Sequence, residues 1–221
     1  MSGSALEALL VQGLREIAPS LGRTPTQQLL AYAGEVARWT QRVNLTGFKD
    51  PERIIREGVL RSLRLLPFLP GGSGVRLADV GSGAGFPGVP LKIARPSLLV
   101  TLIEASRRRA SFLTHVIRLL ELSDISCLKG RAEALSEQAG LQRSFDVVTA
   151  RALAPLPEAM HLLTPLLAPG GIVLIFQGRK TEPQPPTVPP NGHLFEFKDI
   201  PATPLLPGET VAVLRAQRCF T

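Results

Sequence analysis

The sequence has few of the side chains that build disulfide frameworks and metal sites. Its 221 residues include two cysteines, Cys127 and Cys219, which are far apart and outside any C-x-x-C pair, and three scattered histidines. Neither a disulfide scaffold nor a zinc site is therefore expected. We predict no metal centre and a reducing compartment, the cytoplasm.

Long hydrophobic runs are also missing. No apolar stretch approaches the roughly 20 residues that a membrane helix needs, although hydrophobic residues make up 44% of the chain. Near the N-terminus, apolar residues between Leu6 and Ile17 recur at helical spacing rather than in one block, so no secretion signal is expected. These properties predict a globular protein with one substantial core and no membrane segment.

Acidic residues are outnumbered by basic ones. There are 25 lysines and arginines against 18 aspartates and glutamates, which gives a formal net charge of +7 and favours a polyanionic partner. The basic residues gather in 38–64, in 107–109 and around Arg179 and Lys180, within or close to segments predicted to face the site. A bias toward arginine with no binding role stays open as the alternative.

The first seventy residues have the patterns of helices. Thr24, followed by Pro25, and Asp50, followed by Pro51, are predicted helix N-caps. Prolines and glycines at 67–74 then interrupt the helical pattern. We predict a helical N-terminal cap over 1–72 and a main domain over 73–221.

From residue 75 onward, short apolar runs alternate with helical patterns, which is typical of a parallel sheet covered by helices on both faces. The predicted strands are 75–80, 98–104, 125–129, 145–149 and 172–176, and the predicted helices lie near 87–95, 107–122, 131–138 and 155–167. A proline-rich loop is predicted over 181–190, followed by an antiparallel pair of strands at 193–197 and 210–215. The predicted fold class is α/β.

The first of these strands runs into a glycine-rich loop. Glycines at 81, 83 and 85 allow a sharp turn and are expected to let a ligand lie directly on backbone N–H groups. The dinucleotide fingerprint G-x-G-x-x-G requires a further glycine where this chain has Phe86, so NAD is disfavoured. A glycine-rich turn that binds nothing is the alternative.

Acidic residues stand at the ends of the predicted strands. With Asp79 before it, the G-x-G-x-G loop resembles the S-adenosylmethionine loop of class I methyltransferases, which can hold a cationic ligand beside that carboxylate. Glu104 follows 25 residues later, near the offset at which a carboxylate accepts hydrogen bonds from ribose hydroxyls. An ordinary surface glutamate is the alternative. Ala132 and Glu133, after the third strand, could meet an adenine ring.

Arg151 comes just after the fourth predicted strand, at the same sheet edge as the glycine loop. Its planar guanidinium can reach a carboxylate or a phosphate through two N–H groups. A structural ion pair with Asp146 or Glu133 is the alternative.

Four segments together resemble one family. Residues 79–88, 131–133 and 149–152, with Trp39–Thr46 in the helical cap, resemble the bacterial ribosomal RNA small-subunit methyltransferase G family, also called glucose-inhibited division protein B. The resemblance covers nearly the whole chain. It implies a Rossmann-like class I methyltransferase fold, S-adenosyl-L-methionine as cofactor, and methylation of guanine N7 in small-subunit ribosomal RNA. It also implies a cytoplasmic protein, expected to be monomeric, with ribosomal RNA or the ribosomal subunit as its partner.

Site residues follow from the loop, the strand ends and the resemblance together. The candidate catalytic residues, expected to position the base or a phosphate, are Asn44 and Arg151. The candidate cofactor-binding residues are Asp79, Gly81, Gly83, Gly85, Phe86, Glu104, Ala132, Glu133 and Arg151.

The chain departs from the family pattern at Gly58, Arg61 and Gln177, where relatives usually have His, Asp and Lys. These changes are expected toward the side that faces RNA. Two other functions therefore stay open. One is a catalytically silent protein that binds ribosomal RNA or assists assembly, and the other is a methyltransferase with a different substrate.

Overall fold

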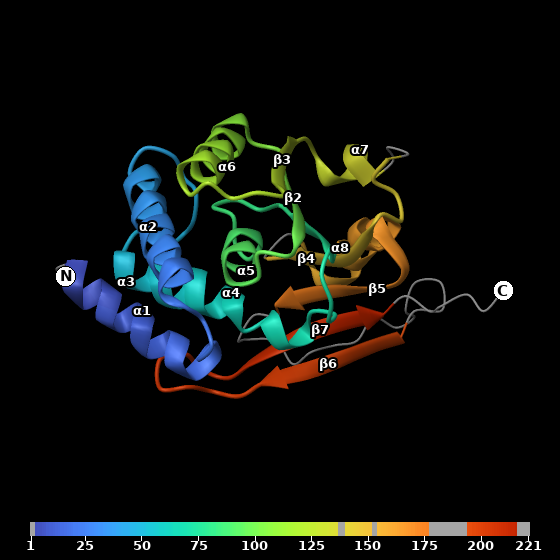
Figure 1. Cartoon of the computed structure of the whole chain (residues 1–221). Helices are drawn as coiled ribbons and strands as arrows, with labels where there is room; N and C mark the ends of the chain where they lie inside the picture. The colour runs from blue at the N-terminus through green and yellow to red at the C-terminus, as the bar shows by residue number, and fades with distance from the viewer. Residues whose placement is uncertain (1–2, 137–139, 152–153, 177–193, 216–221) are drawn as a thin grey trace.

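The computed structural model describes residues 3–136, 140–151, 154–176 and 194–215 (Figure 1). Several sequence predictions lie outside these residues and are not tested by the structure. They concern the proline-rich loop at 181–190 and the residues Gln177, Arg179, Lys180 and Cys219.

A seven-stranded sheet runs through the molecule in the order β3-β2-β1-β4-β5-β7-β6. The strands are β1 (Arg76–Val80), β2 (Leu99–Glu104), β3 (Ile125–Lys129), β4 (Phe145–Ala150), β5 (Leu167–Phe176), β6 (Leu194–Ile200) and β7 (Glu209–Arg215). The first five pair in parallel, whereas β7 is antiparallel to both β5 and β6. The predicted α/β fold, its five parallel strands and its antiparallel pair are thus confirmed.

Helices cover both faces of this sheet. They are α5 (Gly88–Ala94), α6 (Arg107–Leu119), α7 (Ala132–Ser136) and α8 (Leu156–Leu163), the last continued by the short 3₁₀ turn η3 (Thr164–Leu166). Figure 1 shows α5 and α6 on one side of the sheet with the N-terminal helices, and α7 and α8 on the other. The buried apolar side chains accordingly form two clusters, one for each face.

The N-terminal helices belong to the first of these clusters. They are α1 (Gly3–Ile17), α2 (Arg23–Thr40), α3 (Pro51–Arg53), the π-helical η1 (Ile54–Leu60), α4 (Arg61–Leu63) and the 3₁₀ turn η2 (Leu66–Phe68). Buried residues of α1, α2 and η1 join the same apolar cluster as α5 and α6. The division of the chain after residue 72 stays a prediction.

Of the two predicted N-caps, one is confirmed and one is wrong. The Asp50 carboxylate accepts a hydrogen bond from the backbone N–H of Arg53, 3.1 Å away. Helix α2, however, begins at Arg23, so its N-cap is Gly22 and Thr24 lies inside the first turn. Glycine can occupy an N-cap, and its carbonyl accepts from the Thr26 hydroxyl here.

The basic segment at 38–64 includes one arginine that faces inward. Arg64 is 4% exposed, and its guanidinium donates to the carbonyls of Ile200, Pro201 and Pro207 and to the carboxylate of Glu209. This side chain joins the end of the N-terminal helices to the β6–β7 connection. The expectation that the basic residues of this segment face a partner is therefore wrong for Arg64.

Candidate functional site

The site lies where the direction of the strand order changes, at the carboxyl ends of β1 and β4. Val80, the last residue of β1, is level with Ala150 at the end of β4 and with Ile103 in β2. In open α/β sheets the helices connected to two such strands lie on opposite faces, which leaves a crevice at this edge. The glycine loop and Arg151 both follow directly from these strands.

The glycine loop requires glycine at three positions because of its backbone conformation. Gly81, Gly83 and Gly85 have φ angles of 70°, 58° and 97°, in the region that L side chains rarely adopt. Their N–H groups are already used inside the protein. They donate to the carbonyl of Ile103 at 2.9 Å, to the carboxylate of Glu104 at 2.8 Å and to the carbonyl of Ser82 at 2.7 Å. The expectation that a ligand lies on these N–H groups is therefore corrected: the positive φ angles of the turn are what require the three glycines.

Asp79 lies at the bottom of the site and is completely buried. One carboxylate oxygen accepts from the N–H of Gly88 at 3.1 Å, while the other has no hydrogen-bond partner among the described residues. Burial raises the pKa of Asp79 to about 7, against the opposing hydrogen bond from Gly88. A buried carboxyl with an unused oxygen is suited to a cationic ligand group.

The raised pKa of Asp79 predicts a pH-dependent stability of the free protein. Because the folded-state pKa lies above the unfolded value, the stabilising contribution is complete below pH 4 and is lost as the pH rises toward 7. The slope is at most about 1.4 kcal/mol per pH unit. Urea unfolding of the unliganded protein at several pH values measures it, and in Asp79→Asn this part of the slope should be missing. An identical pH profile in the two proteins would contradict the assignment.

Tyr32 of α2 supports the glycine loop from below. Its side chain is fully buried, and its hydroxyl donates to the carbonyl of Ala84 at 2.6 Å. Its ring also meets that of Phe86 edge-on, with the centroids 5.5 Å apart. Helix α2 thus fixes the position of the loop.

We expect Tyr32→Phe to weaken this support without disturbing the packing, because only the hydroxyl is removed. The carbonyl of Ala84 then loses its buried partner, which costs about 1 to 3 kcal/mol. Hydrogen exchange should quicken locally at residues 82–86 and the unfolding free energy should fall by that amount. Unchanged exchange in this loop would show that the hydrogen bond does not hold it.

Glu104 ends β2 beside the loop and is held by two backbone N–H groups. One carboxylate oxygen accepts from Gly83 and the other from Ser106, each at 2.8 Å. Glu104 is only 4% exposed, so the alternative of an ordinary surface glutamate is wrong. Each oxygen keeps a lone pair with which to accept from a hydroxyl.

Ala132 and Glu133 open α7 at the neighbouring strand end. The N–H of Gly130, just before them, donates to the Glu104 carbonyl at 3.1 Å. Ala132 is buried and Glu133 is exposed. The structure therefore brings these two residues to the same edge as Glu104, as the sequence predicts.

Arg151 follows β4 and packs against two aromatic rings. Its guanidinium carbon lies 5.3 Å from the ring centroid of Phe48 and 5.8 Å from that of Phe86. One guanidinium nitrogen is buried with no hydrogen-bond partner among the described residues. Burial, and after it the nearby charge of Arg61, lower the pKa of Arg151 to about 10. Such a group has the capacity to bind an anion or a carbonyl.

The suggested ion pair between Arg151 and Asp146 is not formed. Asp146 instead receives two hydrogen bonds from the Arg76 guanidinium, at 2.8 and 3.1 Å. These bonds hold the pKa of Asp146 below its usual range. The alternative of an ion pair with Asp146 is therefore wrong for Arg151.

Asn44 lies in the connection between α2 and α3, which passes over the glycine loop. Its side chain is exposed, and its backbone carbonyl accepts from Arg109 at 2.9 Å. A Cβ at Gly83 would lie 3.4 Å from the carbonyl of Leu45. Phe48 from the same connection contacts Arg151, a contact that sequence reasoning missed because no local spacing marks it.

Two of the departures from the family pattern make contacts inside the protein. Gly58 is buried directly against the Phe86 ring, and a Cβ there would clash with the ring carbons, so a larger side chain requires the ring to move. Arg61 forms an ion pair with Glu209 at 2.5 Å and lies over the Phe176 ring at 4.8 Å. The side chain of Arg61 is 15% exposed, so it contributes little to the outer surface.

The residues present fit a nucleoside ligand with a positively charged part. The unpartnered oxygen of Asp79 suits a cation, and the Glu104 carboxylate, held by the N–H groups of Gly83 and Ser106, suits ribose hydroxyls. The sheet with its antiparallel seventh strand and this loop define a class I S-adenosylmethionine-dependent methyltransferase.

Comparison with solved structures agrees on the fold. A precorrin-6y C5,15-methyltransferase of Geobacter metallireducens matches 71% of this chain and 87% of its own with a TM-score of 0.50 at 10% identity. TrmN of Thermus thermophilus matches 71% of this chain and 48% of its own with a TM-score of 0.51 at 20% identity. At these identities the likeness shows the fold alone.

Comparison of sequences identifies the family. The model of rRNA small subunit methyltransferase G (GidB) matches residues 25–186. Relatives named ribosomal RNA small subunit methyltransferase G include one in Sorangium cellulosum, 40% identical over 77% of this chain and 73% of its own. Another, in Burkholderia cenocepacia, is 32% identical over 92% of this chain and 89% of its own. The chain belongs to this family, and it is a methyltransferase that uses S-adenosyl-L-methionine.

Two further observations concern the described residues alone. No group of three or more His, Cys, Asp or Glu side chains there is arranged to hold a metal ion. In the same part of the chain, the helices lack the length and apolar content needed to cross a bilayer.

Proposed function

We propose that the protein transfers a methyl group from S-adenosyl-L-methionine to N7 of a guanine in small-subunit ribosomal RNA. The observation that carries the proposal is the meeting of Asp79, Glu104 and Arg151 around one glycine loop, in a chain of the rRNA small subunit methyltransferase G family. The net charge of +7 suits a polyanionic substrate.

In this proposal the cofactor is held by residues from four strand ends. Asp79 lies nearest its positively charged part, Glu104 accepts from its ribose hydroxyls, and Ala132 with Glu133 contacts the adenine. The turn at Gly81, Gly83 and Gly85 lies against it, and Phe86 borders it on the same side as Arg151, with which it is in contact. S-adenosyl-L-methionine supplies an electrophilic methyl group on a sulfonium.

Guanine N7 carries a free lone pair at neutral pH, so no proton has to be removed before it reacts. The protein therefore needs no general base. What its residues contribute is alignment, and a well-oriented complex can lower a barrier by several kcal/mol, with a misplacement of about 1 Å costing about 100-fold in rate. We assign this alignment to Arg151, whose guanidinium nitrogen is unpartnered among the described residues, and to Asn44 in the connection above the loop.

The decisive test separates this reaction from the two alternatives. Purified small subunits that lack the modification, free ribosomal protein and small nucleophiles are each incubated with methyl-labelled cofactor. Label in the RNA of the subunits alone supports the proposal. Label in protein or small molecules indicates another substrate, whereas cofactor binding without any transfer indicates a silent protein.

Three wider properties complete the proposal. The protein acts in the cytoplasm, where ribosomal subunits are assembled, works as a monomer, and requires no metal. Its N-terminal cap over 1–72 carries Asn44, and the domain over 73–221 carries the cofactor site.

A further inference from the structure

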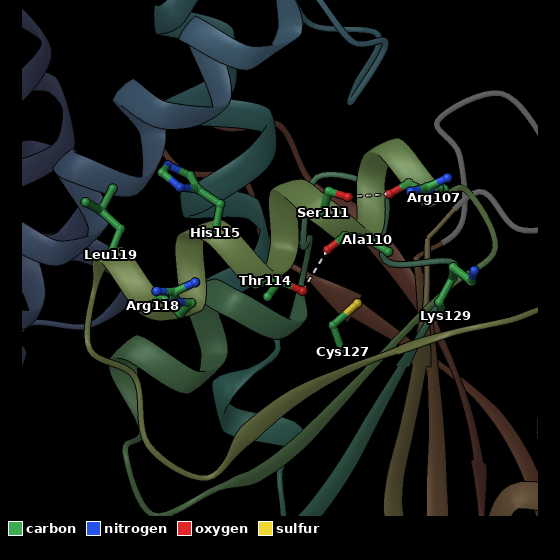
Figure 2. Close-up of a pocket in the computed structure, with 9 residues that line it drawn as sticks. All are labelled: Arg107, Ala110, Ser111, Thr114, His115, Arg118, Leu119, Cys127 and Lys129. Carbon is green, nitrogen blue, oxygen red and sulfur yellow. Dashed lines mark hydrogen bonds between the residues drawn. The ribbon is translucent and has the colours of Figure 1, made fainter.

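A polar groove lies outside the site described above, between α6 and the edge strand β3. It has a volume of about 750 Å³, and Figure 2 shows the residues that line it. We call it the α6–β3 groove. Because β3 ends the sheet on this side, no further strand of the sheet covers it.

One face of α6 builds the wall of this groove. Arg107, Ser111, Thr114 and Arg118 follow one another at intervals of four, three and four residues, which places them along one helix face. All four are exposed. At 1.5 Å per residue the two arginines stand about 16 Å apart, and Lys129 lines the groove from β3.

The groove is positively charged. Arg107, Arg118 and Lys129 line it, and no acidic residue does. Within the described parts of the chain, these three cations form no ion pair and donate no side-chain hydrogen bond. His115 also lines the groove but is hydrogen-bonded to Glu35 at 2.9 Å, so we do not count it as a free cation.

The two hydroxyls between the arginines can only accept a hydrogen bond from a ligand, because each already donates its own hydrogen within the helix. Ser111 donates to the carbonyl of Arg107 at 2.9 Å, and Thr114 donates to that of Ala110 at 3.0 Å (Figure 2). Each hydroxyl oxygen keeps lone pairs that can accept from a donor in the groove. Two acceptors that lie between two cations match an RNA backbone, which presents phosphate charges and the donor and acceptor of the 2′-hydroxyl.

One end of the groove reaches the cofactor edge of the sheet. Lys129 is level with Glu104 across β2 and β3, and Arg107 follows Ser106, whose N–H donates to that same glutamate. The groove then extends along α6 to Arg118, away from this edge. It is therefore placed to contact RNA that extends beyond the methylated nucleotide.

We propose that the α6–β3 groove binds the phosphate backbone of the ribosomal RNA substrate at a distance from the methyl-transfer site. This inference rests on the proposed function, since it takes RNA as the substrate. The groove sets affinity and does not take part in the transfer.

The test uses Arg118→Ala/Lys129→Ala in the full-length protein. Arg107 is kept because it is close to the cofactor edge. The matched control, Arg15→Ala/Lys198→Ala, removes the same charge from α1 and from β6, the opposite edge of the sheet. Filter binding to protein-free small-subunit RNA at several salt concentrations is measured for all three proteins, together with kcat and KM for subunits and the affinity for the cofactor.

We expect the groove variant to bind RNA about tenfold more weakly. The slope of log binding constant against log salt concentration should become shallower by roughly 1 to 2, about one for each phosphate contact that is lost. KM for subunits should rise similarly while kcat and cofactor affinity stay unchanged, and the control should change little. Equal losses in both variants, or none in either, would overturn the proposal. A raised KM for subunits with unchanged binding of naked RNA would also overturn it, because the groove would then contact a ribosomal protein.

The two proposals fail differently. If the unaltered protein methylates no RNA, the proposed function is wrong. If it methylates RNA and the groove variant behaves as the control does, only the groove assignment is wrong.

Discussion

Arg151→Ala should lower kcat for methyl transfer to small subunits by about 100-fold, the cost of losing alignment at the reacting atoms. The guanidinium lies against Phe86 and Phe48, and one of its nitrogens is buried without a hydrogen-bond partner among the described residues. Its loss therefore removes the group best placed to hold the substrate. Single-turnover transfer of labelled methyl measures the effect, and calorimetry with the cofactor alone separates it from binding.

Arg151→Lys is the matched control, because it keeps the charge but not the planar pair of donors. We expect it to recover cofactor affinity more fully than kcat. Full turnover by Arg151→Ala would remove Arg151 from the mechanism.

Asn44→Ala should also reduce methyl transfer more than it reduces cofactor affinity.

Arg64→Ala should lower the free energy of unfolding by about 3 to 5 kcal/mol, the usual cost of breaking a buried ion pair from one side. The Arg64 and Glu209 side chains are each 2% exposed, and the arginine also satisfies three carbonyls of the β6–β7 connection. Burial raises the pKa of Glu209 against the opposing charges of Arg61 and Arg64. Removing one arginine therefore leaves a buried acid with less compensation.

The control for Arg64 is Arg56→Ala. Arg56 donates to Leu205 in the same connection at 3.1 Å and pairs with Glu52, but its side chain is 30% exposed and water can replace it. We expect a loss of about 1 kcal/mol there. Urea unfolding measures the stability of both variants. Equal losses of unfolding free energy would show that the burial of Arg64 adds nothing to the strength of its contacts.

The sheet and the glycine loop could be predicted because their signals are local. Alternating apolar runs and helical patterns mark the strands, and the glycine spacing with Asp79 marks the loop. Asp79, Glu104 and Arg151 each stand at a strand end, and parallel strands bring such ends to one edge whatever the details of packing. The structure accordingly brings them together.

The inward position of Arg64 could not be predicted in this way. Its acceptors lie 136 to 145 residues further along the chain, and its polar character suggests an exposed helix face. The same reason applies to Tyr32 beneath the loop and to Phe48 beside Arg151, since each contact joins elements that are distant in sequence. The incorrect cap at Thr24 has a local cause, because Gly22 two residues earlier can also begin a helix.

The central claim is tested most directly by the identity of the labelled nucleoside. Small subunits that lack the modification are incubated with the protein and methyl-labelled S-adenosyl-L-methionine, and their RNA is digested and separated. The account predicts one labelled product, 7-methylguanosine, in an amount that approaches one per subunit. Label in any other nucleoside, or none while the cofactor still binds, would contradict it.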